Sequence, residues 1–269
     1  MSSHSLFDQA VALSAVSPNL YTGATSDAFA NMVGPFGGLT AATLLNAVLQ
    51  HPDRLGDPVS LTVNFAGPVG DGPFEVEATP LRTNRSTQHW LLLQKQNGEI
   101  VTSATAFFAT RRETLSEQQL AAPSAPAAET LPAVAVSIRN WFKQYEFRFV
   151  HGVPLTPRQA DQAADTESLL WVRDKPERPL DYLSLTALGD VFAPRIFLLR
   201  ENFTPSGTVS MTHYFHATSD ELARVGSGYL LGQAKASRLH SNYADQIAHL
   251  WSADGLLLLT STQSVYFKE

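Results

Sequence analysis

The feature that most constrains the fold is a phrase that occurs twice. Residues 97–113 read NGEIVTSATAFFATRRE, and residues 254–269 read DGLLLLTSTQSVYFKE. In each copy a two-residue turn, Asn-Gly or Asp-Gly, leads into a run of strand-forming residues with a Thr-Ser pair and then aromatic residues. A repeat at this separation indicates that one supersecondary unit has been duplicated. We therefore expect a chain of two similar halves.

A segment of different composition separates the two copies. Residues 115–134, LSEQQLAAPSAPAAETLPAV, are rich in Ala, Pro, Ser and Glu, which is typical of a linker and cannot build a core. The chain has 269 residues, of which 44% are apolar, enough for two units with cores of their own. The sequence thus predicts an N-terminal unit over residues 1–112, a linker over 113–135 and a C-terminal unit over 136–269.

Each half shows one helix and several strands. Helical spacing of apolar residues predicts helices in FGGLTAATLLNAVLQHPD (36–53) and YLSLTALGDVF (182–192), the second broken by Pro194. Strands are predicted at 59–67, 74–82, 87–94, 99–109, 145–150, 169–174, 208–217, 228–237, 244–252 and 256–267. A βαβ chain would need a helix after nearly every strand. The pattern instead favours an α+β fold, in which an antiparallel sheet packs on a single helix, twice.

Composition excludes several classes of function. A net charge of −6 provides no basic surface for nucleic acid, and the absence of Cys excludes disulfides, thiolate chemistry and Cys-ligated zinc. The N-terminal residues have no basic start and no long apolar run, so we expect a cytoplasmic protein without a membrane partner. His213 and His216 are three apart, which places them on opposite faces of a strand. No HExxH pattern is present, and we predict no metal and no cofactor.

Several blocks in register resemble a known family. They are PFGGLTAATLL (35–45), LTVNFAGPVGDGPFEVEATPLRTNRSTQHWLLLQKQNGEIV (61–101), LGDVFAP (188–194), and the strands that contain HYFHA, YLLGQAKAS and DGLLLLTSTQS. In order and spacing they are similar to the double-hotdog acyl-CoA thioesterases of the thioesterase II type, over nearly the whole chain apart from the linker. The resemblance implies a double hotdog, in which two antiparallel sheets are each wrapped around one central helix.

The resemblance also implies a site. The family uses an Asp, a Ser or Thr and a Gln of the second half to activate a water that attacks the thioester, without a covalent intermediate. The Gln falls on Gln263 and the Ser or Thr on Ser237. The Asp falls on Ser210, which departs from the pattern because a serine cannot act as a carboxylate base. Asp190 is the nearest family-matched carboxylate and the substitute candidate.

The residues themselves bear on these assignments. A buried amide without a partner costs about 1–3 kcal/mol, so Gln263 must bind a side chain, the backbone or a water, in a structural or a catalytic role. Aligning the Thr-Ser pairs places Thr105 opposite Gln263. Burial of Asp190 would raise its pKa and suit a general base, and a solvated place on the outer helix face is the alternative. Ser237 and Ser210, taken alone, are typical of ordinary strand serines.

Gly37 and Gly38 stand where the first helix begins. Unpaired N–H groups at a helix start can hold a thioester oxygen or a developing oxyanion, and glycine lets a ligand approach. Tight packing of the helix start would need glycine equally. If the first reading holds, the active site lies at the seam between the halves. The positive side chains available for the phosphates of coenzyme A, or else solvated at the surface, are Arg82, Arg85, Arg195 and Arg238.

The leading functional expectation is hydrolysis of fatty acyl-CoA to free acid and coenzyme A. A hotdog hydratase or dehydratase needs an Asp-His pair in a loop, and no such stretch is found. The third possibility is a degenerate double hotdog that binds acyl-CoA or acyl chains without turnover, which Ser210 favours. Two hotdogs in one chain already form the usual two-subunit unit, and exposed sheet faces commonly pair further. We therefore expect a homodimer of double hotdogs.

Overall fold

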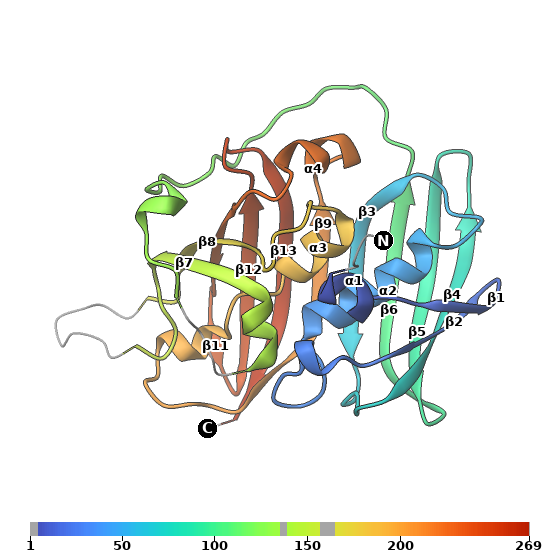
Figure 1. The fold of residues 1–269 in the computed structure, drawn as a ribbon, viewed down its shortest axis with the longest axis horizontal. Coiled ribbons are helices and arrows are strands. Elements are labelled where there is room, and N and C mark those ends of the chain that lie inside the picture. The colour runs from blue at the N-terminus through green and yellow to red at the C-terminus, as the bar shows by residue number, and fades with distance from the viewer. Residues whose placement is uncertain (1–4, 135–138, 157–164, 269) are drawn as a thin grey trace.

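The computed structural model describes residues 5–134, 139–156 and 165–268. Within these residues thirteen strands form one antiparallel sheet that runs through both halves of the chain (Figure 1). The path of neighbouring strands is β1-β2-β4-β5-β6-β3-β9-β13-β12-β10-β8-β7, and β11 pairs with β12 beside it. The strands are β1 (Ser14–Ser17), β2 (Leu20–Ala24), β3 (Asp57–Phe65), β4 (Pro73–Thr83), β5 (Thr87–Gln96), β6 (Glu99–Ala109), β7 (Tyr145–His151), β8 (Ser168–Asp174), β9 (Ser206–Phe215), β10 (Leu230–Lys235), β11 (Leu239–His240), β12 (Tyr243–Trp251) and β13 (Leu257–Phe267).

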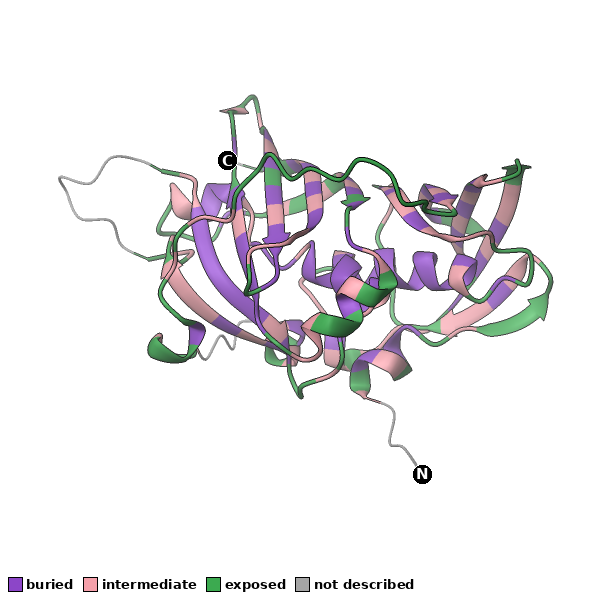
Figure 2. Ribbon diagram, turned by 90° about the horizontal axis from the view of Figure 1, so that it is seen from above, coloured by how far each residue is buried: buried purple, intermediate pink, exposed green. Residues whose placement is uncertain are grey.

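Two helices fill the inside of the curved sheet, one from each half. They are α2 (Gly37–Leu49) and α3 (Tyr182–Leu188), and both are buried nearly all round (Figure 2). Small residues such as Ala41, Ala42 and Ala47 in α2 let it lie close to the strands that surround it. The remaining helical elements are α1 (Leu6–Ala10), α4 (Ser219–Val225), η1 (Asp27–Phe29), η2 (Ala128–Thr130), η3 (Asn140–Gln144) and η4 (Arg195–Leu198).

The predicted α+β architecture is confirmed, with one change. The sequence predicted two separate sheets, whereas β3 and β9 pair directly and join them into one. Both predicted helices and all ten predicted strand segments are present. The elements that the sequence analysis missed are short: α1, α4, β1, β2, β11 and the four single-turn η segments.

The junction of the halves has an approximate two-fold symmetry. Thr62 of β3 lies opposite Thr212 of β9, with 3.0 Å between their hydroxyl oxygens. Thr62 pairs with Thr105 on one side, and Thr212 pairs with Thr262 on the other. The equivalent of Thr105 is therefore Thr262.

By the same register, Gln263 is equivalent to Ala106, and the alignment of Thr105 with Gln263 is wrong by one residue. The turn glycines Gly98 and Gly255 have the same spacing as Ala106 and Gln263. The turns, and not the Thr-Ser pairs, carry the true register, because a one-residue slip would turn every side chain to the opposite face.

The segment predicted as a linker packs against the second half. The indole N–H of Trp171 donates to the carbonyl oxygen of Pro126 at 2.9 Å, and the Gln118 amide donates to the carbonyl oxygen of Gly255 at 2.9 Å. Ala122, Ala125 and Ala128 pack with Trp171 over strands β8 and β10. The predicted boundary between residues 135 and 136 lies outside the described residues.

Candidate functional site

A cavity of about 320 Å³ lies at the seam between the two halves. The first half contributes the loop before α2, the start of α2 and the turn after β3. The second half contributes β7, the segment after α3, and parts of β9, β12 and β13. The wall is mostly aromatic and aliphatic, and its polar side chains include Thr40, Ser168, Asp190, Arg195, Thr208, Gln246 and Gln263.

Asp190 lies just past the end of α3 and not on the helix itself. The helix ends at Leu188, and Gly189 is its C-cap. A side chain at Gly189 would clash with His213, since a Cβ there would lie 2.5 Å from the ring carbon Cε1. The chain therefore turns tightly against the sheet at Gly189 and delivers the Asp190 carboxylate to the start of α2. A Cβ on Gly37 would be 2.9 Å from Oδ2 of Asp190.

The environment of Asp190 shifts its pKa strongly. Burial raises the pKa from 3.8 to about 7, because the cavity wall removes water from the carboxylate. Hydrogen bonds from the Gln263 amide and from the backbone N–H of Gly38 lower the pKa, but burial outweighs them. Near neutral pH both protonation states of Asp190 are therefore populated, which is what a group that takes up and returns a proton requires.

Gln263 reaches Asp190 from β13. Its Nε2 donates to Oδ1 of Asp190 at 2.7 Å, and its Oε1 accepts from the hydroxyl of Thr208 at 3.0 Å. An ionised carboxylate only accepts hydrogen bonds, so the amide must turn its nitrogen to Asp190 and its oxygen to Thr208. Gln263 is 7% exposed. Asp190 and Thr208 are the hydrogen-bond partners that this buried amide requires.

Both glycines at the start of α2 lie beside Asp190, and they differ in their surroundings. A Cβ on Gly38 would lie 2.6 Å from the carbonyl oxygen of Ala187, so glycine there permits close packing of α2 on α3. The backbone N–H of Gly38 donates a hydrogen bond to the Asp190 carboxylate. Gly37 lines the cavity, and its N–H has no hydrogen-bond partner among the described residues. Of the two, Gly37 is the donor positioned for a ligand.

Ser237 and Ser210 do not lie at the cavity. Ser237 is exposed, and its backbone N–H is bonded to the Asp245 carboxylate at 3.0 Å. Ser210 follows the strand alternation opposite to its neighbour Met211, which contacts Gln263. A register shift between Ser264 and Val265 instead brings Thr208 to Gln263. Family register alone cannot reveal such a bulge. The geometry supports neither assignment to serine, because Ser237 is exposed and Thr208 takes the place beside Gln263 that was expected for Ser210.

Gln246 is a cavity residue that the sequence analysis missed. It lies on β12 directly opposite Gln263, lines the cavity and is 1% exposed. Its Oε1 has no hydrogen-bond partner in the part of the chain that the structure describes. The signal was present in the sequence. Ala244, Gln246 and Ala248 occupy every second position of the strand and share its inward face, and a lone amide between two alanines on a buried face requires a hydrogen-bond partner.

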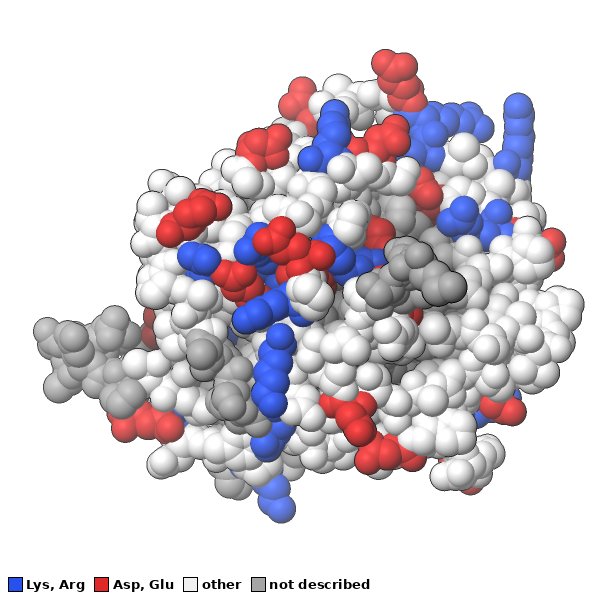
Figure 3. Space-filling model, in the orientation of Figure 1, with Lys and Arg blue, Asp and Glu red and all other residues white. Residues whose placement is uncertain are grey.

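The four candidate arginines separate into two kinds. Arg82, Arg85 and Arg238 are exposed, whereas Arg195 is 2% exposed and lines the cavity. On the face shown in Figure 3, Lys and Arg side chains are interspersed with Asp and Glu.

Within the described residues, no three His, Asp or Glu side chains are grouped so that they could hold a metal ion. None of the described helices is long and apolar enough to cross a bilayer.

Two family models match the chain. One, the acyl-CoA thioesterase N-terminal domain, covers residues 26–109, and the other, the acyl-CoA thioesterase C-terminal domain, covers residues 117–267. No curated protein matched the sequence.

Solved structures agree in fold over nearly the full length. A conserved protein of unknown function with a hot dog fold, from Alicyclobacillus acidocaldarius, is 44% identical, with 99% of each chain covered and a TM-score of 0.94. The acyl-CoA thioesterase II of Mycobacterium marinum is 20% identical, with 97% of this chain and 98% of that chain covered and a TM-score of 0.76. A tesB protein of Mycobacterium avium subspecies paratuberculosis is 19% identical, with 98% of each chain covered and a TM-score of 0.78. The double-hotdog fold is thereby confirmed.

Proposed function

Because the chain belongs to the acyl-CoA thioesterase family, we propose that it hydrolyses fatty acyl-CoA to a free acid and coenzyme A. One observation carries the proposal. A buried carboxylate, Asp190, has its pKa raised to about 7 and is held by Gln263 at the start of a helix, inside an apolar cavity. The site thus combines a base whose pKa is near neutral pH, a helix N-terminus that can stabilise a developing oxyanion, and an apolar wall suited to an acyl chain.

The reaction proceeds by one attack of water and without a covalent intermediate. Asp190 takes a proton from a water molecule while the water oxygen bonds to the thioester carbonyl carbon. The carbonyl oxygen becomes negative and is stabilised by the N–H of Gly37 at the start of α2. The carbon–sulfur bond then breaks, and the sulfur receives the proton that Asp190 had taken. Acid and free thiol leave, and the carboxylate is restored.

The two amides have different roles in this scheme. Gln263 keeps the Asp190 carboxylate in place through the 2.7 Å hydrogen bond, and Thr208 fixes the Gln263 amide in turn. Gln246 lies beside Gln263 with an Oε1 that has no partner among the described residues, and it holds the attacking water. Ser237 and Ser210 have no part in the proposed reaction, because neither lines the cavity.

A second candidate function is binding of acyl-CoA or acyl chains without turnover. The observation that favours it is the location of Ser237 and Ser210 outside the cavity, which leaves the site without two groups of the family pattern. In that case Asp190 and Gln263 would be a structural pair only.

Release of free thiol from acyl-CoAs, from acetyl to palmitoyl, tests the proposal. We expect release with a clear optimum of chain length, and its loss in Asp190→Asn. A folded protein that acyl-CoA stabilises against heat, but that releases no thiol at any chain length, would overturn the hydrolase proposal in favour of the binder.

We also propose that the units 1–112 and 136–269, joined by 113–135, act together in a homodimer. The dimer is supported by an apolar patch on the outer face of β9, β12 and β13. Five large side chains are exposed there: Val209, Tyr214, Tyr243, Ile247 and Tyr266. Light scattering should give twice the mass of the chain, and Tyr243→Lys should lower it. A monomeric mass for the native protein would contradict the dimer.

A further inference from the structure

The cavity contains a buried positive charge that the proposed reaction does not use. Arg195 begins η4, directly after Pro194, and lines the same cavity as Asp190. Only 2% of the residue is exposed. Arginine is rarely buried to this extent unless it is paired, so the groups that stabilise the Arg195 guanidinium have to be identified.

Arg195 is held in place by neutral acceptors. Its Nη1 donates to the hydroxyl of Ser168 at 3.0 Å and to the carbonyl oxygens of Thr166 at 3.2 Å and Ala234 at 3.3 Å. Its Nε donates to the carbonyl oxygen of Ala193 at 3.0 Å, and Nη2 donates to the same oxygen. These bonds fix the guanidinium rigidly, and none of the acceptors carries a charge.

No described acidic side chain therefore compensates the charge of Arg195. Within the described residues it forms no ion pair, whereas Arg178, whose side chain is 11% exposed, pairs with both Asp8 and Asp181. Burial is the cause that lowers the pKa of Arg195. A buried cation without a counter-ion is costly to the folded state, and an anion that entered the cavity would relieve that cost.

One donor also remains for such an anion. A guanidinium has five N–H bonds. Three acceptors share the two of Nη1, and the carbonyl oxygen of Ala193 receives Nε–H and one N–H of Nη2. The second N–H of Nη2 has no acceptor among the described residues. A hydrogen bond from it to an anion would be charge-assisted and strengthened by the apolar wall.

The place of Arg195 relative to the reacting groups indicates which anion fits. Ser168 and Ala234 anchor it over β8 and β10, and Gln263 is on β13, with β12 between them. Two strand spacings of about 4.8 Å separate β13 from β10, so the strand that anchors the guanidinium lies roughly 10 Å from the strand of Gln263. The phosphates of coenzyme A are bulky, strongly hydrated groups on the far side of the thioester sulfur. They do not suit a residue with 2% exposure, whereas the distal end of a bound acyl chain does.

We propose that Arg195 binds a carboxylate at the distal end of the acyl chain, so that the preferred substrates are coenzyme A thioesters of dicarboxylic acids. The preference in rate that this inference predicts rests on the proposed hydrolysis, whereas the preference in binding affinity does not. It names Arg195 as a specificity-determining residue that contacts the substrate away from the bond that breaks.

A binding experiment tests the inference without turnover. The probes are the monomethyl ester of hexanedioic acid and methyl hexanoate, which differ only in the distal carboxylate. Calorimetry should show the acid ester binding to the native protein at least tenfold more tightly, with the preference kept at high salt because the pair is buried. Arg195→Met should abolish the preference, and the matched control Arg238→Met, at an exposed arginine, should keep it. Equal affinities in the native protein would overturn the inference.

Kinetics provide a second, independent arm. The ratio of kcat/KM for hexanedioyl-CoA to that for hexanoyl-CoA should exceed ten in the native protein, fall below one in Arg195→Met and recover in part in Arg195→Lys. If the native ratio is one or less, the inference fails even where Arg195→Met does not fold. If neither thioester is cleaved but the binding preference stands, the hydrolase proposal fails and the anion site survives.

Discussion

The two halves of the molecule place different residues at equivalent positions of the sheet. Where the second half pairs Gln246 with Gln263 across β12 and β13, the first half pairs Trp90 with Ala106 across β5 and β6. The indole of Trp90 is fully buried and fills the space that a cavity would need. The same backbone therefore gives a cavity with two amides in its largely apolar wall on one side and a packed core on the other.

The residue that follows each central helix also differs between the halves: it faces the cavity in the second half and is packed in the core in the first. Asp190 comes directly after the C-cap of α3, and His51 comes directly after the C-cap of α2. His51 packs edge-on against Trp90 at 4.7 Å and hydrogen-bonds Asn19 at 2.9 Å, and burial lowers its pKa. A neutral, fully packed imidazole stands where the other half has a carboxylate that faces the cavity.

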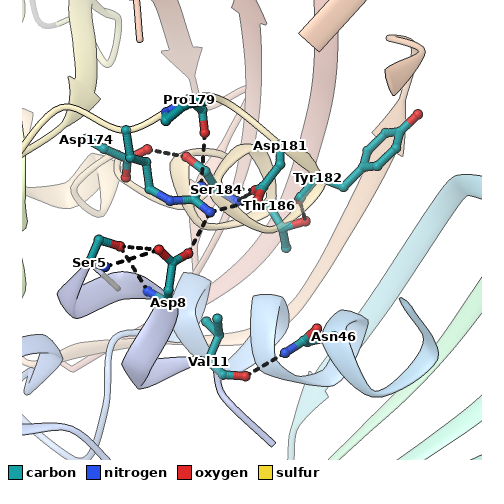
Figure 4. Close-up of polar contacts among 11 residues, drawn as sticks. Ser5, Asp8, Val11, Asn46, Asp174, Pro179, Asp181, Tyr182, Ser184 and Thr186 are labelled. Atoms are coloured by element: carbon teal, nitrogen blue, oxygen red, sulfur yellow. Dashed lines mark hydrogen bonds and ion pairs between the residues drawn. The ribbon is translucent and has the colours of Figure 1, made fainter. Parts of the chain in front are cut away.

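The starts of the two helices also differ. The N-cap of α3 is Asp181, whose carboxylate accepts the N–H of Ser184 at 2.8 Å, and Figure 4 shows this end closed by a polar network that reaches Asp8 of α1. Arg178 completes that network by bonding both carboxylates. The N-cap of α2 is Phe36, whose side chain makes no capping bond. Of the two helix starts, that of α2 lines the cavity and that of α3 does not, so one site per chain is expected, built from both halves.

The sharpest test of this asymmetry is Asp190→Asn. We expect kcat to fall by about 10²–10⁴-fold, the usual contribution of a general base, while the fold is kept because the amide oxygen still accepts from Gln263. Thiol release measures the loss. The matched control is Asp181→Asn at the closed helix start, which should lower Tm and leave kcat unchanged. A loss of activity in Asp181→Asn as large as in Asp190→Asn would contradict the assignment of the site to one end.

Trp90→Ala tests the closed side. Removing a fully buried indole should reduce the free energy of unfolding by about 3–5 kcal/mol, since a cavity opens in the core. The preference among acyl-CoA chain lengths should stay as it is, because Trp90 does not line the cavity. Denaturant unfolding gives the stability, and thiol release gives the preference. A changed chain-length optimum in this variant would show that the two sides are not independent.

Gln263→Ala should lower kcat by roughly tenfold to a hundredfold, which is the effect of losing one hydrogen bond to a charged group. That bond lowers the pKa of Asp190, so its loss should also move the midpoint of the pH–rate profile upward. Thr105→Ala is the control for register. It should change neither quantity, because Thr105 is exposed and is the equivalent of Thr262.

The raised pKa of Asp190 has a consequence for stability. Its carboxyl group has a pKa of 3.8 when unfolded and about 7 when folded, so the folded protein binds the proton more tightly. The stabilisation is complete below about pH 4 and is lost as the pH rises to about 7. Asp190→Asn should therefore gain stability relative to the native protein across that window, by up to a few kcal/mol. Urea unfolding at pH 5 and pH 8 measures it, and an unchanged difference between the two pH values would contradict the shift.

The smallest expected effect is that of Gln246→Leu. Its unpartnered oxygen contributes nothing to folding, so the leucine variant should be as stable as the native protein or slightly more so. If Gln246 holds the attacking water, kcat should fall several-fold with little change in KM. Full activity in the leucine variant would remove Gln246 from the mechanism.

The sequence predicted the architecture because local patterns carry it. Turn residues such as Gly98 and Gly255, helical spacing in α2 and inward alternation along β12 are all short-range signals. The site was predicted in part. Asp190 and Gln263 were named, but their hydrogen bond depends on how α3 turns at Gly189 against β9, which is a long-range contact.

The assignments to Ser210 and Ser237 were not supported, for two different reasons. A bulge in the β9–β13 pairing brings Thr208 to Gln263 in place of Ser210, and the sequence of the strand does not reveal it. Ser237 lies beyond the end of β10, where it is exposed. Gln246 was overlooked although its inward position could have been predicted. Arg195 was classed with three exposed arginines because burial of a cation depends on acceptors such as Ser168 and Ala234, far away in the sequence.

The continuous sheet that joins β3 to β9 has a consequence for inheritance. In an assembly of two identical chains, each codon specifies both symmetric positions, and a tryptophan that closes one pocket would close the other as well. Here the two positions are encoded separately within one reading frame, so Trp90 and Gln246 can mutate one at a time. Fusion of the two halves thereby permits one pocket to be given up for stability while the other is free to change its substrate.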